Sequence, residues 1–493
     1  MTAYKKLTEL FKQVSTFDEI TSILEWDMAT MMPSQSRASR IKQIKVLTQK
    51  KREIFHQIEK KDLFEKIDPF KLKRDEQRNL MLMKRKFELF LFIPNNLMLK
   101  NQRLSLECEG RWREAKKKNN YNLVKKELLK LFKSIKEKSK ILSEKWEVSE
   151  YDALLSLYDQ SFKSNEITKF ASDVESFIKK KYKAFSTAHN KKNYVEFDSY
   201  LNEEEQFELS KFVMNKFGFP FNKGRVDTSL HPFCGGYSDD IRITTKFTKS
   251  DFFSSFDALM HETGHALYEF GLPKGFKNQL VGKAAGMSIH ESQSLFLEMQ
   301  IAKTKEFNVF LEKILKNKFK KFSLSWKSQN LYNKRNSFKK NFIRIEADEV
   351  HYPLHIIHRF NIEKKLISDE KLINFLPDIW NSEFKKIFNL EVKSDNEGCL
   401  QDIHWFSGDF GYFPTYLLGA MIAAQLKKAL DEDIPDIDQK IKSGNLKVIT
   451  SWLKQNIHTH GNKFSANEIL MKVTGQKLDS LFYKNHLKDR YLN

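Results

Sequence analysis

The chain has 493 residues, of which 40% are hydrophobic and 30% charged, a composition that excludes a disordered chain and is typical of a globular protein with a large core. The net charge of +21 would suit a nucleic-acid binder, but the lysine-rich stretch 117–140 has Leu and Ile at helical spacing and no RNA-binding pattern accompanies it, so we expect no nucleic acid. The three cysteines lie far apart, which predicts a reducing cytoplasmic compartment and no disulfides. No apolar run approaches 18 residues, so no membrane span is expected. The first residues lack the apolar core of a secretory signal.

Most of the chain is expected to be helical, because glycine and proline are scarce and apolar residues recur every three or four positions. The early segments with this spacing are residues 4–25, 37–66, 71–93, 97–118, 120–145, 165–190 and 202–216. Only residues 236–248 alternate as a strand does, which predicts one short strand or hairpin. No linker or repeat is found, so the fold class is all-α (mainly helical) with a small β element.

Residues 261–265 read H-E-T-G-H and lie in a segment, 250–271, whose apolar stripe predicts a helix. On a helix, His261 and His265 lie one turn apart, so both imidazoles can reach one tetrahedral metal ion. Glu262 lies beside them, where it can take a proton from the attacking water. The pattern predicts a metal site with its own general base.

A catalytic zinc needs a third protein ligand, and the next helical segment, 287–303, offers His290, Glu291 and Glu298. Glu291 is preferred, because a glutamate on a second helix is the arrangement of glutamate-type zinc peptidases. Glu298, seven residues later, is the alternative ligand or a residue that supports one. Asp257, one turn before His261, is placed to orient an imidazole.

A second histidine group, His351, His355 and His358, shares one helical face. Pro353 lies among these residues and no glutamate adjoins them as a base, so we expect packed or exposed imidazoles and not a primary metal site. His355 alone is retained as a residue that could line a cleft.

Several motifs in order along the chain resemble those of the carboxypeptidase Taq (thermostable carboxypeptidase) family of zinc metallocarboxypeptidases. Besides H-E-x-x-H, they are the stretch 25–40 (EWDMATMMPSQSRASR), His231-Pro232-Phe233, Asp240-x-Arg242-x-Thr244, His290-Glu291-Ser292-Gln293, Ile343-Arg344-x-x-Ala347-Asp348, Gly398-x-x-Gln401-Asp402-x-His404-Trp405 and the stretch 456–475. The resemblance covers nearly the whole chain.

The resemblance implies one metallocarboxypeptidase domain over residues 1–493, with a deep central groove similar to that of neurolysin and angiotensin-converting enzyme. Helices of about 1–220 would cover the groove, and about 221–493 would form the catalytic part. It further implies release of single C-terminal residues with broad preference from peptides with a free C-terminal carboxylate. Members are generally cytoplasmic homodimers.

By the same resemblance, one metal ion per subunit is held by His261, His265 and Glu291, with Glu262 as general base. The metal is expected to be zinc, with cobalt or manganese as alternatives. 

A carboxypeptidase must also bind the terminal carboxylate, which calls for arginine. Arg344 is the first candidate and Arg242 the second, although Arg344 could instead pair with Asp348, one turn later. His231 would help to close one end of the groove.

The oxyanion that develops during peptide hydrolysis needs hydrogen-bond donors. His404 and Tyr416 are the candidates by similarity to related helical zinc peptidases, with Tyr412 as the alternative donor. Two other functions stay open at this point. One is a peptidyl-dipeptidase or oligoendopeptidase on the same scaffold, and the other is a non-enzymatic scaffold or nucleic-acid protein that kept the fold.

Overall fold

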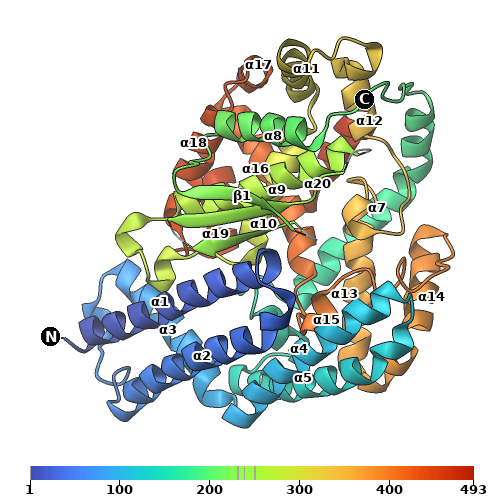
Figure 1. Ribbon diagram of the computed structural model, residues 1–493. Helices are drawn as coiled ribbons and strands as arrows, with labels where there is room; N and C mark the ends of the chain where they lie inside the picture. Colours follow the sequence, from blue (N-terminus) through green and yellow to red (C-terminus); the bar gives the residue numbers. More distant parts are fainter. Residues whose placement is uncertain (1, 230–231, 238, 249–250, 493) are drawn as a thin grey trace. The chain divides into compact units, whose positions relative to one another are not determined.

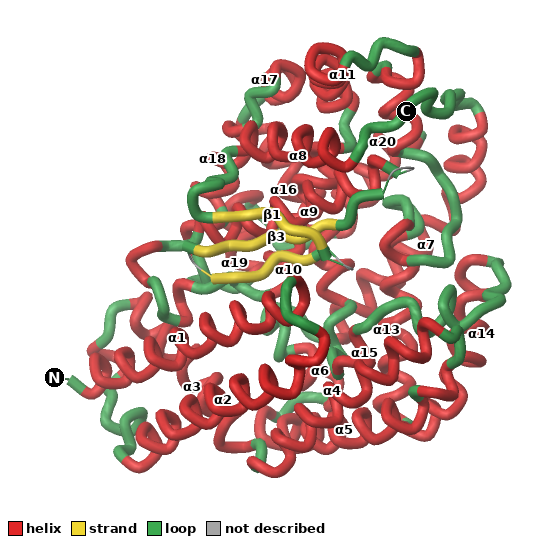
Figure 2. Tube along the Cα trace, in the orientation of Figure 1, coloured by secondary structure: helices red, strands yellow, loops and turns green. Residues whose placement is uncertain are grey.

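The computed structural model describes residues 2–229, 232–237, 239–248 and 251–492. Helices dominate, and the strands form one small sheet (Figures 1 and 2), which confirms the predicted class. Within these residues, no helix is long and apolar enough to cross a bilayer.

The chain divides into two compact units, each built from three separate segments. Unit 1 combines Met1–Phe90, Asn193–Arg335 and Ile422–Leu478, and unit 2 combines Leu91–Lys192, Asn336–Met421 and Asp479–Asn493. The expected single domain with a central groove stays a prediction.

Unit 1 contains the helices α1 (Ala3–Thr30), α2 (Arg37–Lys60), α3 (Arg74–Phe92, its last two residues in unit 2), α8 (Glu203–Phe217), α9 (Phe252–Gly271), α10 (Met287–Leu295), α11 (Lys305–Phe319), α12 (Ser328–Arg335), α17 (Ile437–Ser443), α18 (Lys447–Asn456) and α19 (Ala466–Thr474). Unit 2 contains α4 (Asn95–Lys117), α5 (Lys125–Trp146), α6 (Glu150–Leu155), α7 (Ser164–Asn190), α13 (Tyr352–Ser368), α14 (Leu376–Phe388), α15 (His404–Ser407) and α20 (Ser480–Tyr491). Helix α16 (Pro414–Asp433) begins in unit 2 and ends in unit 1. The seven early helices are thus found as predicted, with ends displaced by a few residues, whereas the six-residue α6 was missed.

The sheet of unit 1 has three strands side by side, which are yellow in Figure 2, in the order β1-β3-β2. Strand β1 (Gly224–Thr228) is parallel and β2 (Phe233–Tyr237) is antiparallel to the central β3 (Asp240–Thr245). The strand or hairpin predicted over residues 236–248 corresponds to β3 and the last two residues of β2, while β1 and the rest of β2 were not foreseen. Ile241 and Ile243 are buried under α9, which packs on β3. Gly236, near the end of β2, has a positive φ of 86°, and a Cβ there would lie 2.0 Å from the Asp240 carbonyl oxygen, so this position requires glycine.

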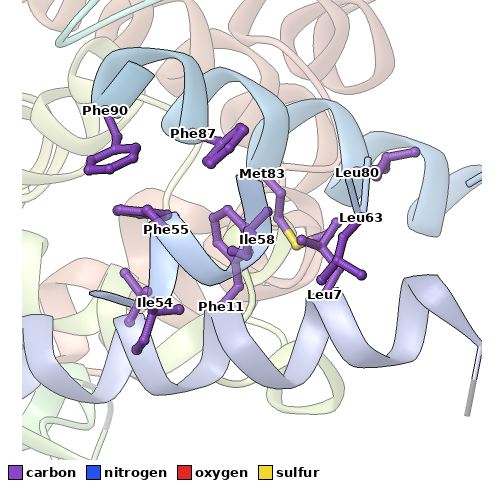
Figure 3. Packing of buried hydrophobic residues seen from close by; sticks show 11 residues of the cluster. Leu7, Phe11, Ile54, Phe55, Ile58, Leu63, Leu80, Met83, Phe87 and Phe90 are labelled. Atoms are coloured by element: carbon purple, nitrogen blue, oxygen red, sulfur yellow. The ribbon is translucent and has the colours of Figure 1, made fainter. Parts of the chain in front are cut away.

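A phenylalanine-rich core joins α1, α2 and α3 (Figure 3). Leu7, Phe11 and Val14 follow one face of α1 at helical spacing and are almost fully buried. Phe11 meets Phe55 of α2 edge to face at a centroid distance of 5.8 Å. Such aromatic pairs stabilise a core beyond their burial alone, and they account for part of the high phenylalanine content.

Candidate active site

Helices α9 and α10 bring three candidate ligands together in unit 1. His261 and His265 lie one turn apart on α9, and Glu291 lies on α10. The helices approach closely because residue 264 is glycine: a Cβ on Gly264 would lie only 2.3 Å from the carbonyl oxygen of Gln293 on α10. Gly264 of the H-E-T-G-H stretch therefore has a structural role, because it allows the two helices to approach.

The ligand atoms have the spacing of a tetrahedral metal site. His261 Nε2 is 3.7 Å from Glu291 Oε1, and His265 Nε2 is 3.4 Å from Glu291 Oε2. One donor atom from each residue lies within 4.8 Å of the others. Ligand bonds of 2.0–2.1 Å in a tetrahedron put neighbouring donors about 3.3 Å apart. Two imidazoles and a carboxylate at this spacing fit a divalent cation such as zinc.

Each imidazole has a further partner within unit 1. Glu298 lies on the π-helical segment η6 (Phe296–Ala302) that continues α10, and its Oε2 is 2.9 Å from His261 Nδ1. His265 Nδ1 is 2.6 Å from Nδ1 of His290. The expectation for Asp257 was wrong, because its carboxylate pairs with Arg335 instead of an imidazole. Glu298 contacts His261, which corresponds to the second of its two predicted roles, a residue that supports a ligand.

The charges of this cluster also favour a cation. Burial lowers the pKa of His261, but Glu291, Glu298 and Glu262 outweigh burial and raise that pKa to about 9. Burial raises the pKa of Glu262 to about 7, against the effect of His261. Burial lowers the pKa of His265 to about 4, so this imidazole is neutral, as a metal ligand must be. The carboxylates that raise the pKa of His261 would favour a bound divalent cation in the same way.

The rival histidines belong to the core of unit 2. His351 Nδ1 lies 2.7 Å from Asp348 Oδ2, and the Nε2 atoms of His355 and His358 each donate to a backbone carbonyl at 3.0 Å. All three imidazoles are fully buried. They are hydrogen-bonded core residues, as expected, and His355 lines no described cleft.

Arg344 belongs to a buried ionic network in unit 2. Its Nε and Nη2 donate to Oδ1 of Asp402 at 3.1 and 2.9 Å, and Arg359 Nε donates to Oδ2 at 2.7 Å. The two guanidinium groups hold the pKa of Asp402 far below its ordinary value despite burial, and burial with Arg344 nearby lowers the pKa of Arg359 to about 10. The alternative pair with Asp348 does not form. Two arginines share one carboxylate, which leaves one positive charge in excess.

The candidate oxyanion donors lie beside this network in the same unit. Tyr416 packs under the Arg344 guanidinium at 4.8 Å, and its hydroxyl is 3.0 Å from His404 Nε2. The Tyr412 ring packs at a tilt against the His404 ring at 5.5 Å and edge to face against the Tyr416 ring at 5.3 Å. His404, Tyr416 and Arg344, which the sequence had proposed separately, thus form one cluster.

Residues 6–491 match the family described as carboxypeptidase Taq (M32) metallopeptidase. The chain belongs to this family. It is 32% identical over 504 residues to carboxypeptidase 1 of Bacillus subtilis (strain 168), an alignment that covers 99% of this chain and 98% of that protein. Among solved structures, metallocarboxypeptidase 1 of Trypanosoma cruzi (TM-score 0.93, 31% identity) and a carboxypeptidase of Pyrococcus furiosus (TM-score 0.92, 29% identity) each cover 100% of this chain and 99% of their own.

Membership of the M32 family makes the protein a metal-dependent carboxypeptidase, a hydrolase whose substrates are peptides. It implies a divalent metal, and the group of His261, His265 and Glu291 offers the donor atoms for one.

The remaining substrate-binding candidates are Arg242 and His231. Arg242 is bonded through Nε and Nη2 to both carboxylate oxygens of Asp240, at 2.8 and 2.7 Å, and stacks on Trp26 at 4.6 Å. Thr244 accepts from the Phe233 amide at 3.1 Å, so part of this motif holds β2 and β3 together. His231 lies outside the described residues.

Two contacts of the candidate site were missed from the sequence. Glu269 Oε1 is 2.9 Å from Nε2 of His290, and the four-residue spacing from His265 to Glu269 could have indicated it. No sequence spacing could have indicated the contact of Arg359, because its partner Asp402 is 43 residues away and meets it only in the folded unit.

Proposed function

We propose that this carboxypeptidase uses zinc, held by His261, His265 and Glu291 alone, and releases single C-terminal residues with broad preference. The observation that supports the proposal is the cluster of two imidazoles and one carboxylate within 4.8 Å. Three protein ligands leave a fourth position open, as catalytic zinc sites require, and imidazole donors suit zinc better than magnesium or calcium. Cobalt and manganese are the alternatives.

Glu262 is the proposed general base. When bound, zinc would polarise the scissile carbonyl and lower the pKa of the attacking water. Glu262 takes the proton from that water and passes it to the nitrogen of the leaving amino acid. Burial raises the pKa of Glu262 above its ordinary value, which favours its acceptance of a proton.

Arg344 is the proposed binding residue for the terminal carboxylate. Its guanidinium is held in place by Asp402, and the excess positive charge of the two arginines suits a second carboxylate. His404 and Tyr416 are the proposed oxyanion donors. Arg242 stays the second candidate for the terminal carboxylate, and His231 and Arg242 are proposed to close one end of the groove.

We further propose that the protein is a cytoplasmic homodimer that forms one domain around a central groove. The family resemblance supports these proposals, and the few scattered cysteines agree with a reducing compartment.

The test is a timed digest of one peptide, with a free and with an amidated C-terminus, followed by mass spectrometry with and without a chelator. We expect the free peptide to lose residues one at a time, and chelation or amidation to stop the reaction. Dipeptide or internal products, or equal cleavage of the amidated peptide, would favour the peptidyl-dipeptidase or oligoendopeptidase alternative.

A pair of arginine variants tests the carboxylate site. Arg344→Lys keeps a charge but loses the planar fork, so we expect it to raise KM for the free peptide more than the matched Arg242→Lys does. Equal effects of the two substitutions would remove Arg344 from this role.

A further inference from the structure

The two imidazoles of the cluster have different partners. His261 Nδ1 meets a carboxylate directly, at 2.9 Å from Glu298. His265 Nδ1 meets another imidazole, at 2.6 Å from His290. A metal-binding histidine usually donates its second ring N–H to a carboxylate, a backbone carbonyl or water, so a histidine in that place needs an explanation.

The hydrogen atoms of this chain of contacts have one consistent arrangement. A neutral imidazole has one donor and one acceptor nitrogen. His265 Nε2 faces Glu291 at 3.4 Å and must keep its lone pair to bind a metal, so Nδ1 carries the hydrogen and donates to His290 Nδ1. His290 Nε2 then carries its own hydrogen and donates to Glu269 Oε1 at 2.9 Å. The reverse direction would place a hydrogen on His265 Nε2 and prevent ligation.

The His290 ring is held from several sides. It precedes Glu291 on α10, whereas Glu269 lies on α9, one turn after His265, so the contacts join the two helices that carry the ligands. The ring of buried Tyr268 packs against His290 at 5.3 Å, and the Tyr268 hydroxyl accepts from the Ala285 amide. A ring fixed in this way can fix the orientation of its neighbour.

We propose that His290 and Glu269 are positioning residues for the metal: Glu269 orients His290, and His290 orients His265. The proposal rests on the proposed function, because it requires His265 to be a ligand. It assigns to the histidine of the His290-Glu291-Ser292-Gln293 stretch a role distinct from that of Glu291, the proposed ligand.

The experiment measures zinc affinity by competition with a chromophoric chelator. His290→Ala should weaken zinc binding by about 10- to 100-fold, the effect of losing a partner of a metal ligand. His290→Asn should restore most of the loss, because its amide oxygen can accept from His265 and its amide nitrogen can donate to Glu269. His56→Ala, which removes an exposed histidine–glutamate pair on α2, is the control and should bind zinc as the wild type does.

A merely structural role predicts a different pattern. In that case His290→Ala would lower the unfolding temperature measured in excess chelator, and His290→Asn would not restore zinc affinity. Either finding overturns the proposal. Should His290→Ala fail to fold, Glu269→Ala takes its place, since Glu269 is partly exposed; unchanged zinc affinity in that variant also overturns the proposal.

The variant His265→Ala separates this inference from the proposed function. If His265→Ala binds zinc as tightly as the wild type, the ligand assignment itself fails. If His265→Ala loses zinc while His290→Ala binds it normally, only the positioning role fails.

Discussion

The substitution Gly264→Ala tests whether the close approach of α9 and α10 sets the geometry of the metal centre. A Cβ at residue 264 would lie 2.3 Å from the Gln293 carbonyl oxygen and 2.5 Å from the Ser294 Cα. Carbon–oxygen contacts are normally no shorter than about 3.3 Å, so the helices must separate by about 1 Å. Gln293 and Ser294 follow Glu291 by two and three residues, so the same shift moves that carboxylate away from the two histidines.

The separation should affect stability and activity to different extents. Overpacking of this kind costs about 1–3 kcal/mol of unfolding free energy, which a protein of this size can tolerate. A displacement of about 1 Å in a catalytic group can reduce the rate about 10²-fold. We therefore expect a folded variant with weaker zinc binding and a kcat lower by about two orders of magnitude.

The assay combines urea unfolding, zinc competition and steady-state kinetics on a short peptide. The matched control is Gly110→Ala on α4, where a Cβ meets no atom within 4 Å. There alanine should raise the unfolding free energy by about 0.5–1 kcal/mol through its higher helix propensity and leave the kinetics unchanged. Wild-type zinc affinity and kcat in Gly264→Ala would refute the reasoning.

Three further predictions concern single carboxylates. Glu262→Gln should lower kcat by about 10²- to 10⁴-fold while zinc content stays unchanged, because the role proposed for Glu262 is that of a base and not of a ligand. Kinetics and elemental analysis of one preparation check this, and full activity with zinc retained would contradict it. Glu291→Ala should lose zinc by elemental analysis, whereas unchanged stoichiometry and affinity would turn attention to Glu298. Burial raises the pKa of Glu363 from 4.5 to about 7, so its contribution to stability is present at low pH and is lost as pH rises through that range; Glu363→Gln should flatten the pH dependence of the unfolding free energy there, and an unchanged dependence in urea unfolding would contradict the shift.

Features that depend on neighbours along one helix could be predicted from the sequence. The early helices follow from apolar spacing, and Leu7 and Phe11 are buried on the face of α1 that this spacing indicates. The same reasoning placed His261 and His265 one turn apart. Glu291 was preferred among three candidates on the next helix, and the observed cluster includes it.

Features that depend on tertiary packing could not be predicted in this way. Strand β1 pairs in parallel with β3, and its five residues show no alternation that distinguishes them from a loop. The contact between His265 and His290 requires the closeness of α9 and α10, which only the glycine at position 264 permits. No spacing rule relates residues on two different helices.

The partner of Arg344 shows where a local rule ceases to apply. Pairing with Asp348 assumed that both residues lie on one helix, but Arg344 lies in a short 3₁₀ turn that ends at Glu346, before α13 begins. Asp348 is engaged at the start of that helix, where it accepts from the amides of Val350 and His351 and bonds to the His351 ring. Arg344 therefore turns to Asp402, which it must share with a second arginine. A pair with Asp348 alone would have neutralised the guanidinium, whereas the shared carboxylate leaves one positive charge in excess. The proposed binding of a peptide's terminal carboxylate by Arg344 depends on that charge.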